Sequence, residues 1–248
     1  MIYYICCCVI GMCIASFINV VIIRIPRGED FVLGRSHCDY CGKEIVWYDL
    51  IPVLSYLMLK GRCRYCRNKI SIRSFFIEIF GGIIGVFCFF RFGFCDEMIC
   101  IFLIAMLLLA LAMIDLDTMT IPDGLNVSIF LVCFVLVILR EMNILESIIG
   151  MFCISLPMFL LNLVIPNSFG GGDIKLMFVS GMILGWKYSL LAIFIAIFIA
   201  GIYCIYLILK RKVNKKAHIA FGPFLSIGIF TSLCYGQEIV SWYLNLLM

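Results

Sequence analysis

Long apolar runs separated by short polar segments make up most of the chain. These runs are long enough to cross about 30 Å of hydrocarbon as helices of roughly 20 residues, whereas barrel strands would alternate in polarity over about ten residues. The pattern predicts an all-α, polytopic membrane protein with about eight transmembrane helices, near residues 2–23, 75–92, 98–114, 124–139, 144–165, 174–186, 188–209 and 219–235. The sixth run is short, Gly181 and Gly185 interrupt it, and a Gly-rich acidic motif occupies its start, so we expect a broken or partly water-exposed helix there.

Composition agrees with this pattern. Hydrophobic residues make up 65% of the 248 residues, charged residues make up 14%, and the mean hydropathy is +1.16. These values exclude an ordinary soluble domain. The first run has an apolar core too long for a signal peptide and no preceding basic segment, so we expect it to stay in the protein. The sequence predicts a first transmembrane helix over 1–23, a polar loop over 24–73 and a membrane domain over 74–248.

Basic residues are distributed unevenly along this predicted topology. Ten of the 19 Lys and Arg residues lie in the 24–73 loop, and six more also follow odd-numbered spans: Lys175, Lys210, Arg211, Lys212, Lys215 and Lys216. Since Lys and Arg accumulate in cytoplasmic loops, both termini are predicted outside and the polar loop in the cytosol. Topology also explains the net charge of +4. The expected partner is therefore the lipid bilayer, with no nucleic acid, because no aromatics that could stack bases are interleaved with these residues.

Four of the 15 cysteines differ from the rest because they form two C-x-x-C pairs in the polar loop: Cys38, Cys41, Cys63 and Cys66. The spacing C-x2-C-x21-C-x2-C is close to that of a zinc ribbon, and four thiolates can complete a tetrahedral structural Zn²⁺ site. A reducing cytosol disfavours disulfides. Redox-active or unliganded thiols are the alternatives, and His37 is a candidate substitute ligand.

Two further features near the cysteine pairs have alternative interpretations. The apolar segment 47–60 is too short, and too closely bounded by charge, to span a membrane. It either packs on the zinc module or lies along the membrane surface. Glu78, near the cytosolic end of the second span, either lines the substrate path or pairs with Arg73.

Carboxylates at the ends of two predicted spans are the candidates for chemistry. Asp115 ends the third apolar run and should point into the bundle, whereas Asp117 lies further into the polar loop and should be solvated. Asp123 follows Pro122 at the start of the fourth span, where an acidic side chain can cap free helix N–H groups and favour the helix dipole. Asp173 opens the sixth run. An ionisable group at a membrane edge is a functional-site candidate because its desolvation costs free energy.

Three glycines, Gly170, Gly171 and Gly172, directly precede Asp173. They remove side chains there and so allow a peptide substrate to approach closely. A phosphate-binding turn is the alternative, although these glycines lack the spacing of the known phosphate loops. If the fold brings Asp115 and Asp173 together, one can act as base on water while the other, protonated, polarises the scissile carbonyl. Such a pair shares one proton, because two close carboxylates do not both ionise cheaply.

Together these residues resemble the type IV prepilin peptidase family, the leader peptidases of type IV pilins and type II secretion pseudopilins. The resemblance runs from residues 15–26 of the first span through the cysteine pairs and the D-x5-I-P motif of Asp115, then to the GxGD element ending at Asp173 and to residues 222–224. It covers nearly the whole chain. It implies that Asp115 and Asp173 are the catalytic residues of a GxGD aspartic protease.

The resemblance also implies a place and a reaction. We expect a bacterial inner-membrane endopeptidase that cleaves the basic leader of prepilin or pseudopilin precursors at the cytosolic face. Members with the cysteine loop typically go on to N-methylate the new N-terminus with S-adenosylmethionine, and methyl transfer is associated with that loop. Composition alone leaves two alternatives, an ion- or proton-coupled transporter with a zinc-stabilised loop and a structural membrane scaffold.

Overall fold

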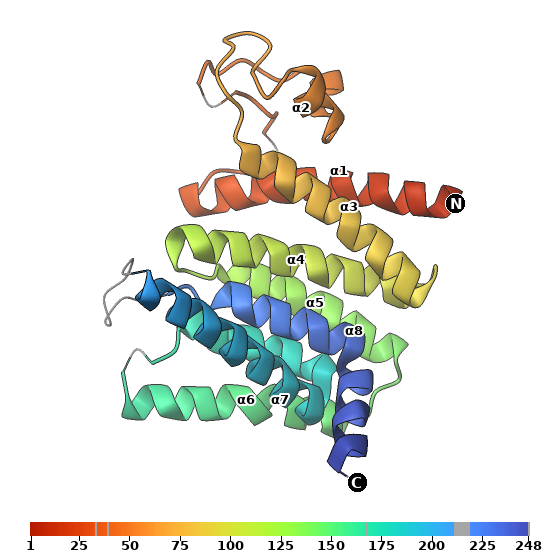
Figure 1. Cartoon of the computed structure of the whole chain (residues 1–248), viewed down its shortest axis with the longest axis vertical. Helices are drawn as coiled ribbons and strands as arrows, with labels where there is room; N and C mark the ends of the chain where they lie inside the picture. Colours follow the sequence, from red (N-terminus) through yellow and green to blue (C-terminus); the bar gives the residue numbers. More distant parts are fainter. Residues whose placement is uncertain (33, 39, 167, 211–218, 248) are drawn as a thin grey trace. The chain divides into compact units, whose positions relative to one another are not determined.

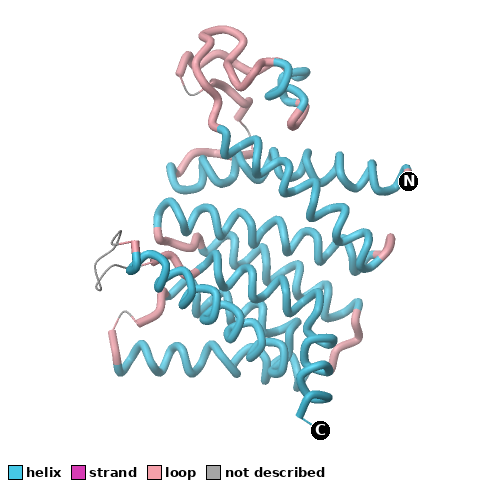
Figure 2. The backbone as a smooth tube through the Cα atoms, viewed as in Figure 1, coloured by secondary structure: helices cyan, strands magenta, loops and turns pink. Residues whose placement is uncertain are grey.

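The computed structural model describes residues 1–32, 34–38, 40–166, 168–210 and 219–247. Helices make up most of this part of the chain (Figure 1), and loops are concentrated between α1 and α3 (Figure 2). The helices are α1 (Ile2–Arg24), α2 (Leu54–Met58), α3 (Ile72–Phe92), α4 (Asp96–Thr118), α5 (Asp123–Leu139), α6 (Ile144–Val164), α7 (Gly171–Leu209) and α8 (Gly222–Leu247), with 3-10 turns η1 (Ile25–Arg27) and η2 (Trp47–Leu50). Within the described residues, β structure is limited to two isolated bridges.

Five of the described helices are long and apolar enough to cross a membrane: α1, α3, α4, α6 and α7. The protein is therefore a multi-pass helical membrane protein. Although α7 contains 39 residues, its helical geometry breaks at Gly185, where φ is +64° and ψ is −177°. This backbone region is essentially restricted to glycine. The break predicted in the sixth run is confirmed, whereas the count of eight spans is not confirmed and stays a prediction.

The chain divides into two compact units, residues 1–98 and residues 99–248. The three-part division predicted from the sequence, with boundaries at residues 23 and 73, stays a prediction. Of the basic residues expected to face the cytosol, Arg211, Lys212, Lys215 and Lys216 lie outside the described residues.

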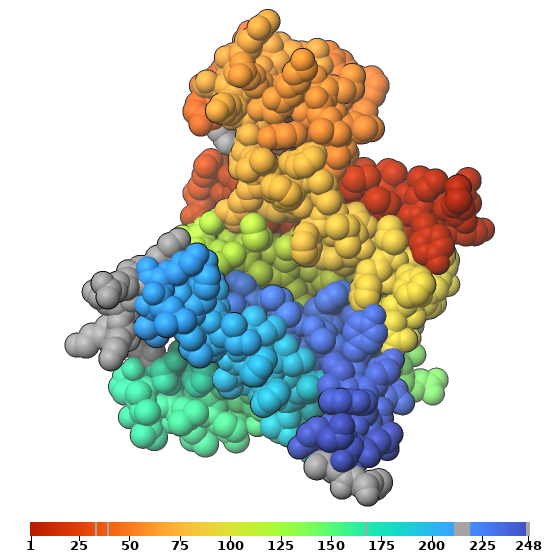
Figure 3. Space-filling model, viewed as in Figure 1, coloured from red at the N-terminus to blue at the C-terminus, as the bar shows by residue number. Residues whose placement is uncertain are grey.

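In the first unit, α1 and α3 pack closely because small residues face each other. A Cβ added at Gly11 would meet the carbonyl oxygen of Gly81, and one added at Gly81 would meet the Cβ of Ala15. Close backbone approach through small residues is typical of membrane helices. The segment between the two helices, which carries the four loop cysteines, projects from them (Figure 3). Helices α1 and α3 therefore form the base of this cysteine segment.

In the second unit, α7 packs against α5, α6 and α8. A Cβ added at Gly150 of α6 would meet the carbonyl oxygen of Gly181, and one added at Gly228 of α8 would meet that of Ala192. These contacts leave no room for side chains, so α7 is held firmly on two sides. The start of α7, which carries Asp173, is thereby placed within the bundle.

Candidate functional site

Asp115 lies near the carboxyl end of α4 and is buried, with 5% of its surface exposed. Its Oδ2 accepts a hydrogen bond of 2.8 Å from the backbone N–H of Gly222, the first residue of α8, which is 107 residues away in the sequence. A Cβ added at Gly222 would lie 2.7 Å from the same oxygen. The carboxylate therefore points into the second unit, as predicted. The N–H of Gly222 fixes its orientation, and a residue with a Cβ could not come this close without displacing the carboxylate.

Asp173 lies in the first turn of α7 and is also buried, with 7% of its surface exposed. Among the described residues, no group donates a hydrogen bond to its Oδ1. A Cβ added at Gly170 would lie 2.9 Å from Oδ2, so the glycine turn passes close to the carboxylate. The ring of Phe169, four residues before Asp173, lies 6.1 Å between centroids from the ring of Phe221, so the start of α7 adjoins the segment whose Gly222 N–H binds Asp115. The fold thus brings together the two carboxylates that the sequence singled out.

The two remaining acids of this stretch are exposed and have different surroundings. Asp117 is exposed, as predicted. Asp123 is the first residue of α5, and it makes no side-chain capping hydrogen bond; its Oδ1 instead accepts a hydrogen bond of 2.7 Å from Nζ of Lys175. The predicted capping role is wrong, because Pro122 occupies the cap position and the ammonium of Lys175 takes the carboxylate. The predicted position in the first turn, where the dipole favours an acid, is confirmed.

The glycine turn before Asp173 is also packed against the segment that precedes α5. A Cβ added at Gly172 would lie 2.5 Å from the Cβ of Ile121, whereas one added at Gly171 would meet nothing within 4 Å. The ion pair between Lys175 and Asp123 joins the same two segments. Of the three glycines, Gly171 is therefore the one with open space beside it.

A pair of buried carboxylates on separate helices has the chemistry that peptide hydrolysis requires. Two carboxylates that come close do not both ionise at low cost, so such a pair can hold one proton between its members. The ionised partner can activate water, and the protonated partner can polarise a carbonyl and later protonate the leaving amine. One hydrogen bond from Gly222 leaves Asp115 with further acceptor sites for a water molecule.

The four loop cysteines form a cluster in the first unit. Their sulfur atoms all lie within 4.8 Å of one another, and Sγ of Cys38 is 3.8 Å from Sγ of Cys66. Four thiolates around Zn²⁺, with Zn–S bonds of about 2.3 Å, would lie about 3.8 Å apart in a tetrahedron, so these residues fit the ion. His37 is not among the clustered groups, and its Nδ1 lies 3.3 Å from the carbonyl oxygen of Arg35. The substitution of His37 for a cysteine ligand is therefore not supported.

The two C-x-x-C segments share one backbone geometry. The N–H of Gly42 donates to the carbonyl oxygen of Cys38 at 2.8 Å, and the N–H of Arg67 donates to that of Cys63 at 3.0 Å. The residue that follows each second cysteine has a positive φ, +67° at Gly42 and +58° at Arg67. Arg67 thus adopts, with some strain, a conformation that glycine adopts freely. The cysteine segment therefore contains two equivalent knuckles, a similarity that the sequence did not reveal.

Local hydrogen bonds favour the metal-binding form of one thiol. Backbone N–H groups of Cys66 and Tyr65 donate to the sulfur of Cys63 and lower its pKa to about 7. The thiolate is the form that binds metal.

Outside the cluster, Arg64 donates from Nε and Nη2 to the two carboxylate oxygens of Asp49, at 2.7 and 2.6 Å. The guanidinium holds the pKa of Asp49 below its ordinary value of 3.8.

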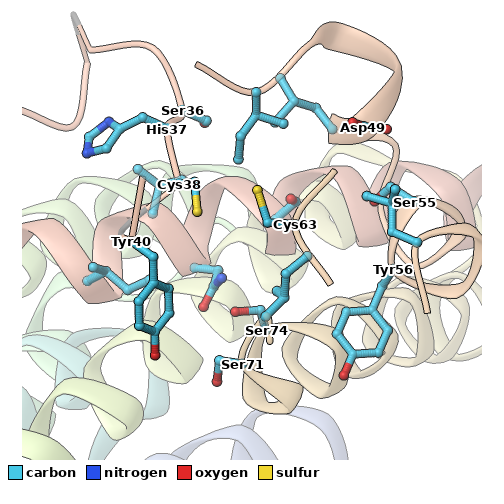
Figure 4. A pocket seen from close by; sticks show the side chains of 18 of the residues that line it. Ser36, His37, Cys38, Tyr40, Asp49, Ser55, Tyr56, Cys63, Ser71 and Ser74 are labelled. Atoms are coloured by element: carbon cyan, nitrogen blue, oxygen red, sulfur yellow. The ribbon is translucent and has the colours of Figure 1, made fainter. Parts of the chain in front are cut away.

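A pocket of about 480 Å³ lies entirely within the first unit, where α1, α3 and the cysteine segment meet. Figure 4 shows Cys38 and Cys63 at one side of it and Ser74 across from them. Tyr40 and Tyr56 lie at opposite flanks in the same view. The pocket thus combines thiols, hydroxyls and aromatic rings.

Glu78 lines this pocket. Its Oε1 accepts a hydrogen bond of 2.8 Å from Oγ of Ser16, and its Oε2 accepts one of 2.8 Å from the backbone N–H of Val53. Of the two alternatives for Glu78, the pairing with Arg73 is not found among the described contacts of this carboxylate. Glu78 therefore connects α1, α3 and the cysteine segment.

Sequence reasoning missed three of these partners: Gly222 of Asp115, and Ser16 and Val53 of Glu78. Gly222 is among the residues 222–224 that carry the family resemblance, but nothing in the sequence points to it as the partner of Asp115, because the two are 107 residues apart. Nothing in the sequence pointed to Ser16 or Val53 as partners of Glu78, because contacts over 62 and 25 residues depend on the tertiary fold.

The fold and these carboxylates define a class: a multi-pass helical membrane protein with the buried acid pair of an aspartic peptidase. Two family models match the chain, the bacterial peptidase A24 N-terminal domain over residues 9–92 and the type IV leader peptidase family over residues 101–205. The chain belongs to the type IV leader peptidase family.

Relatives that carry the name prepilin leader peptidase/N-methyltransferase support this membership. The chain is 32% identical to that of Vibrio cholerae, over 89% of this chain and 96% of the relative, and 28% identical to that of Bacillus subtilis, over 96% of both. The Myxococcus xanthus relative is 41% identical over 119 residues, which is 48% of this chain and 36% of the relative. No solved structure matches the chain.

Proposed function

We propose that the chain is a membrane aspartic endopeptidase that removes the basic leader of type IV prepilins or pseudopilins and then N-methylates the new N-terminus with S-adenosylmethionine. The observation that carries the peptidase half is the burial of Asp115 on α4 and Asp173 at the start of α7, two segments that both meet the start of α8. Membership of the leader peptidase family supports the same reaction, and the names of the relatives support both halves.

In this proposal, the aspartate pair divides the work of hydrolysis. The ionised carboxylate takes a proton from water as the water attacks the scissile carbonyl, and the protonated carboxylate donates to the carbonyl oxygen. Proton transfer to the amine then releases the leader. The N–H of Gly222 keeps Asp115 in one orientation throughout. The carboxylate is therefore already oriented before the reaction, and no further conformational entropy is lost in positioning it.

The glycines before Asp173 give the substrate access to the pair. Gly171 has no neighbour within 4 Å of an added Cβ, so an extended peptide has room to lie beside it. We assign Gly170, Gly171 and Gly172 to this approach. Their small size lets the peptide backbone come close to Asp173 without displacing a side chain.

The four loop cysteines hold a structural Zn²⁺ in this proposal. Two knuckles with the same backbone geometry supply two thiolates each, so all four coordination positions are filled and none is open to water. The ion would fix the fold of the cysteine segment and take no direct part in hydrolysis.

We place the aspartate pair and the cysteine segment at the cytosolic face of a bacterial inner membrane. The support is the charge distribution, since most of the basic residues follow odd-numbered predicted spans. Prepilin leaders are expected there because a basic segment next to an apolar span stays on the cytosolic side.

Purified enzyme in liposomes, incubated with a prepilin and labelled methyl donor, tests both halves by the intact mass of the product. We expect the mass to fall by the leader and to rise by one methyl group. Asp115→Asn and Asp173→Asn should leave the prepilin uncut, because Asn keeps the size of the side chain but cannot exchange a proton. Cleavage retained by both variants would refute the peptidase proposal. The transporter alternative is not favoured by the family membership.

A further inference from the structure

We propose that the pocket of the first unit is the methyl-transfer site, and that the carboxylate of Glu78 binds the terminal ammonium of the cleaved pilin there. The inference rests on the proposed N-methyl transfer. It adds the group of this chain that would receive the amine, which family membership does not supply.

Glu78 differs from the other charged residues that line the pocket. The lining includes three acids, Glu29, Asp49 and Glu78, and five bases, Arg24, Arg27, Lys43, Arg64 and Lys69. Arg24 donates to backbone carbonyl oxygens, and Lys43 lies over the ring of Tyr65. Asp49 is held by Arg64 through two hydrogen bonds, and Glu29 lies 4.0 Å from the guanidinium of Arg27. Glu78 has no cationic partner among the described residues; its contacts are a hydroxyl and a backbone N–H. Within a lining that also holds basic residues, a partly buried carboxylate without a cationic contact of its own favours a cation directly beside it.

The carboxylate of Glu78 is held in place, yet it can still accept further hydrogen bonds. A carboxylate offers about four acceptor positions, and Ser16 and Val53 use one each. The remaining positions can accept hydrogen bonds from an ammonium group. Val53 has φ +62° and ψ −50°, a costly conformation for a β-branched residue, and its N–H is the group that binds Glu78. Strain of this kind is concentrated at functional sites.

The pocket has the size of a small-molecule site, and aromatic rings line it. Its volume of about 480 Å³ lies within the range of small-molecule sites, roughly 300–1,000 Å³. Tyr56 and Phe75 stack with ring centroids 4.8 Å apart, and Tyr40 lies at the opposite flank (Figure 4). Aromatic faces attract cations. The terminal ammonium of the cleaved pilin and the sulfonium of the methyl donor are both cationic.

The proposed reaction transfers one proton and one methyl group. The terminal ammonium passes one proton to the carboxylate of Glu78 and becomes a neutral amine. The nitrogen lone pair forms the N–CH₃ bond while the S–CH₃ bond breaks, and its electron pair stays on sulfur, which leaves as a neutral thioether. Glu78 then releases its proton to water. Each turnover thus consumes one sulfonium and one ammonium and yields one methylammonium, one thioether and one proton.

Glu78→Gln separates this function from a structural one. A glutamine carbonyl oxygen can still accept from the N–H of Val53, and its amide group can still donate to Oγ of Ser16, because a hydroxyl is both donor and acceptor. Only the negative charge is lost. Ser16→Ala makes the opposite change, since it removes a hydrogen bond of Glu78 and keeps the charge. Glu146→Gln, in the exposed first turn of α6, is the matched control for the chemical change.

Two measurements on full-length enzyme test the proposal. In the first, Glu78→Gln should cut prepilin at the wild-type rate but methylate the product at least about 100-fold more slowly, the usual contribution of a positioned base. Ser16→Ala should methylate within about threefold of wild type, as expected when one neutral hydrogen bond is lost. Glu146→Gln should leave both reactions unchanged.

The second measurement needs no turnover. It follows binding of a peptide with the mature pilin N-terminus, either free or acetylated, in the presence of S-adenosylhomocysteine. Wild-type enzyme should bind the free amine about tenfold more tightly, as one charge-assisted hydrogen bond allows. Glu78→Gln should bind both peptides equally, while its affinity for S-adenosylhomocysteine stays unchanged.

Several results would overturn the inference. Methylation at the wild-type rate by Glu78→Gln would do so, as would a preference for the free amine that survives in this variant. Equal losses in Glu78→Gln and Ser16→Ala would assign Glu78 to anchoring alone. A wild-type enzyme that cuts prepilin and never methylates it would refute the methyl-transfer half of the proposed function. The peptide-binding measurement would still test Glu78 by itself: a preference for the free amine that depends on Glu78 would show that Glu78 binds the amine even though methyl transfer is refuted.

Discussion

Replacement of Gly222 by alanine should disable peptide cleavage while leaving the fold intact. Gly222 opens α8, and its N–H donates to Oδ2 of Asp115 at 2.8 Å. An alanine Cβ would lie 2.7 Å from that oxygen, 3.1 Å from Cγ and 3.2 Å from Cβ of Asp115. Since alanine is a good helix former, the helix itself should tolerate the change. The cost should appear in the position of the carboxylate.

The size of the effect follows from these distances. Ordinary contacts of a Cβ begin near 3.4 Å, so Oδ2 of Asp115 must move away by about 0.7 Å. A misplacement of about 1 Å in a catalytic group can cost about 100-fold in rate. We therefore expect Gly222→Ala to lower the rate of cleavage by about 10- to 100-fold. The rate should fall through kcat more than through KM, because the change affects the reacting group and leaves the glycine approach untouched.

The assay is single-turnover cleavage of a prepilin by enzyme in liposomes, with thermal unfolding as a check on folding. Gly201→Ala is the matched control, because Gly201 lies in α7 and nothing lies within 4 Å of an added Cβ. It should cleave like wild type. If Gly222→Ala cleaved at the wild-type rate, the fixed orientation of Asp115 would have no role in catalysis and the reasoning would fail.

Four further predictions concern the glycine turn and the cysteine segment. Gly171→Ala should unfold like wild type but cleave with a raised KM, because the added methyl group meets only the substrate. Metal analysis should find about one zinc ion per chain, lost when Cys38 and Cys63 become Ser. Arg67→Gly should keep zinc and stabilise the cysteine segment by up to about 1 kcal/mol, measured by zinc release on heating, because glycine adopts a φ of +58° without strain. Asp49→Asn should release zinc faster than wild type at neutral pH. Because the pKa of Asp49 is lowered in the folded segment, its ion pair contributes fully above the unfolded value of 3.8, and the difference should be lost as the pH falls through the lowered pKa of the folded segment.

Each of these four has a result that contradicts it. An unchanged KM in Gly171→Ala would remove that glycine from the substrate path. Purified protein without metal would remove the structural zinc and leave the peptidase proposal standing. Faster zinc release from Arg67→Gly would show that the side chain contributes more than the backbone strain costs. A difference between Asp49→Asn and wild type that persists at acid pH would assign the effect to something other than the ion pair.

The cysteine cluster and the carboxylate pair could be predicted because their signals are local or chemically exclusive. C-x-x-C pairs place two thiols together through a few backbone hydrogen bonds, so the spacing alone indicates Cys38, Cys41, Cys63 and Cys66. Charged residues at the ends of apolar runs are costly enough to stand out, as Asp115 and Asp173 did. The break at Gly185 was also readable, because a glycine within an apolar run removes the side chain that would forbid a positive φ.

The rest depended on contacts that no sequence window contains. Gly222 reaches Asp115 over 107 residues, and only the packing of the second unit brings α8 to the end of α4. The sequence predicted Asp123 as a helix cap, but its carboxylate instead accepts a hydrogen bond from the ammonium of Lys175, which is 52 residues away. The role of Glu78 stayed open for the same reason. Its two partners, one on α1 and one in the cysteine segment, depend on how α1, α3 and that segment pack within the first unit.

The measurement that tests the central claim most directly compares cleavage by Asp115→Asn, Asp173→Asn and the double variant. If the two carboxylates work as one proton-sharing unit, each single variant should lose nearly all activity and the double variant should lose no more, because residues that act together are not additive. Measurable cleavage by either single variant, with a further and independent loss in the double variant, would contradict the account.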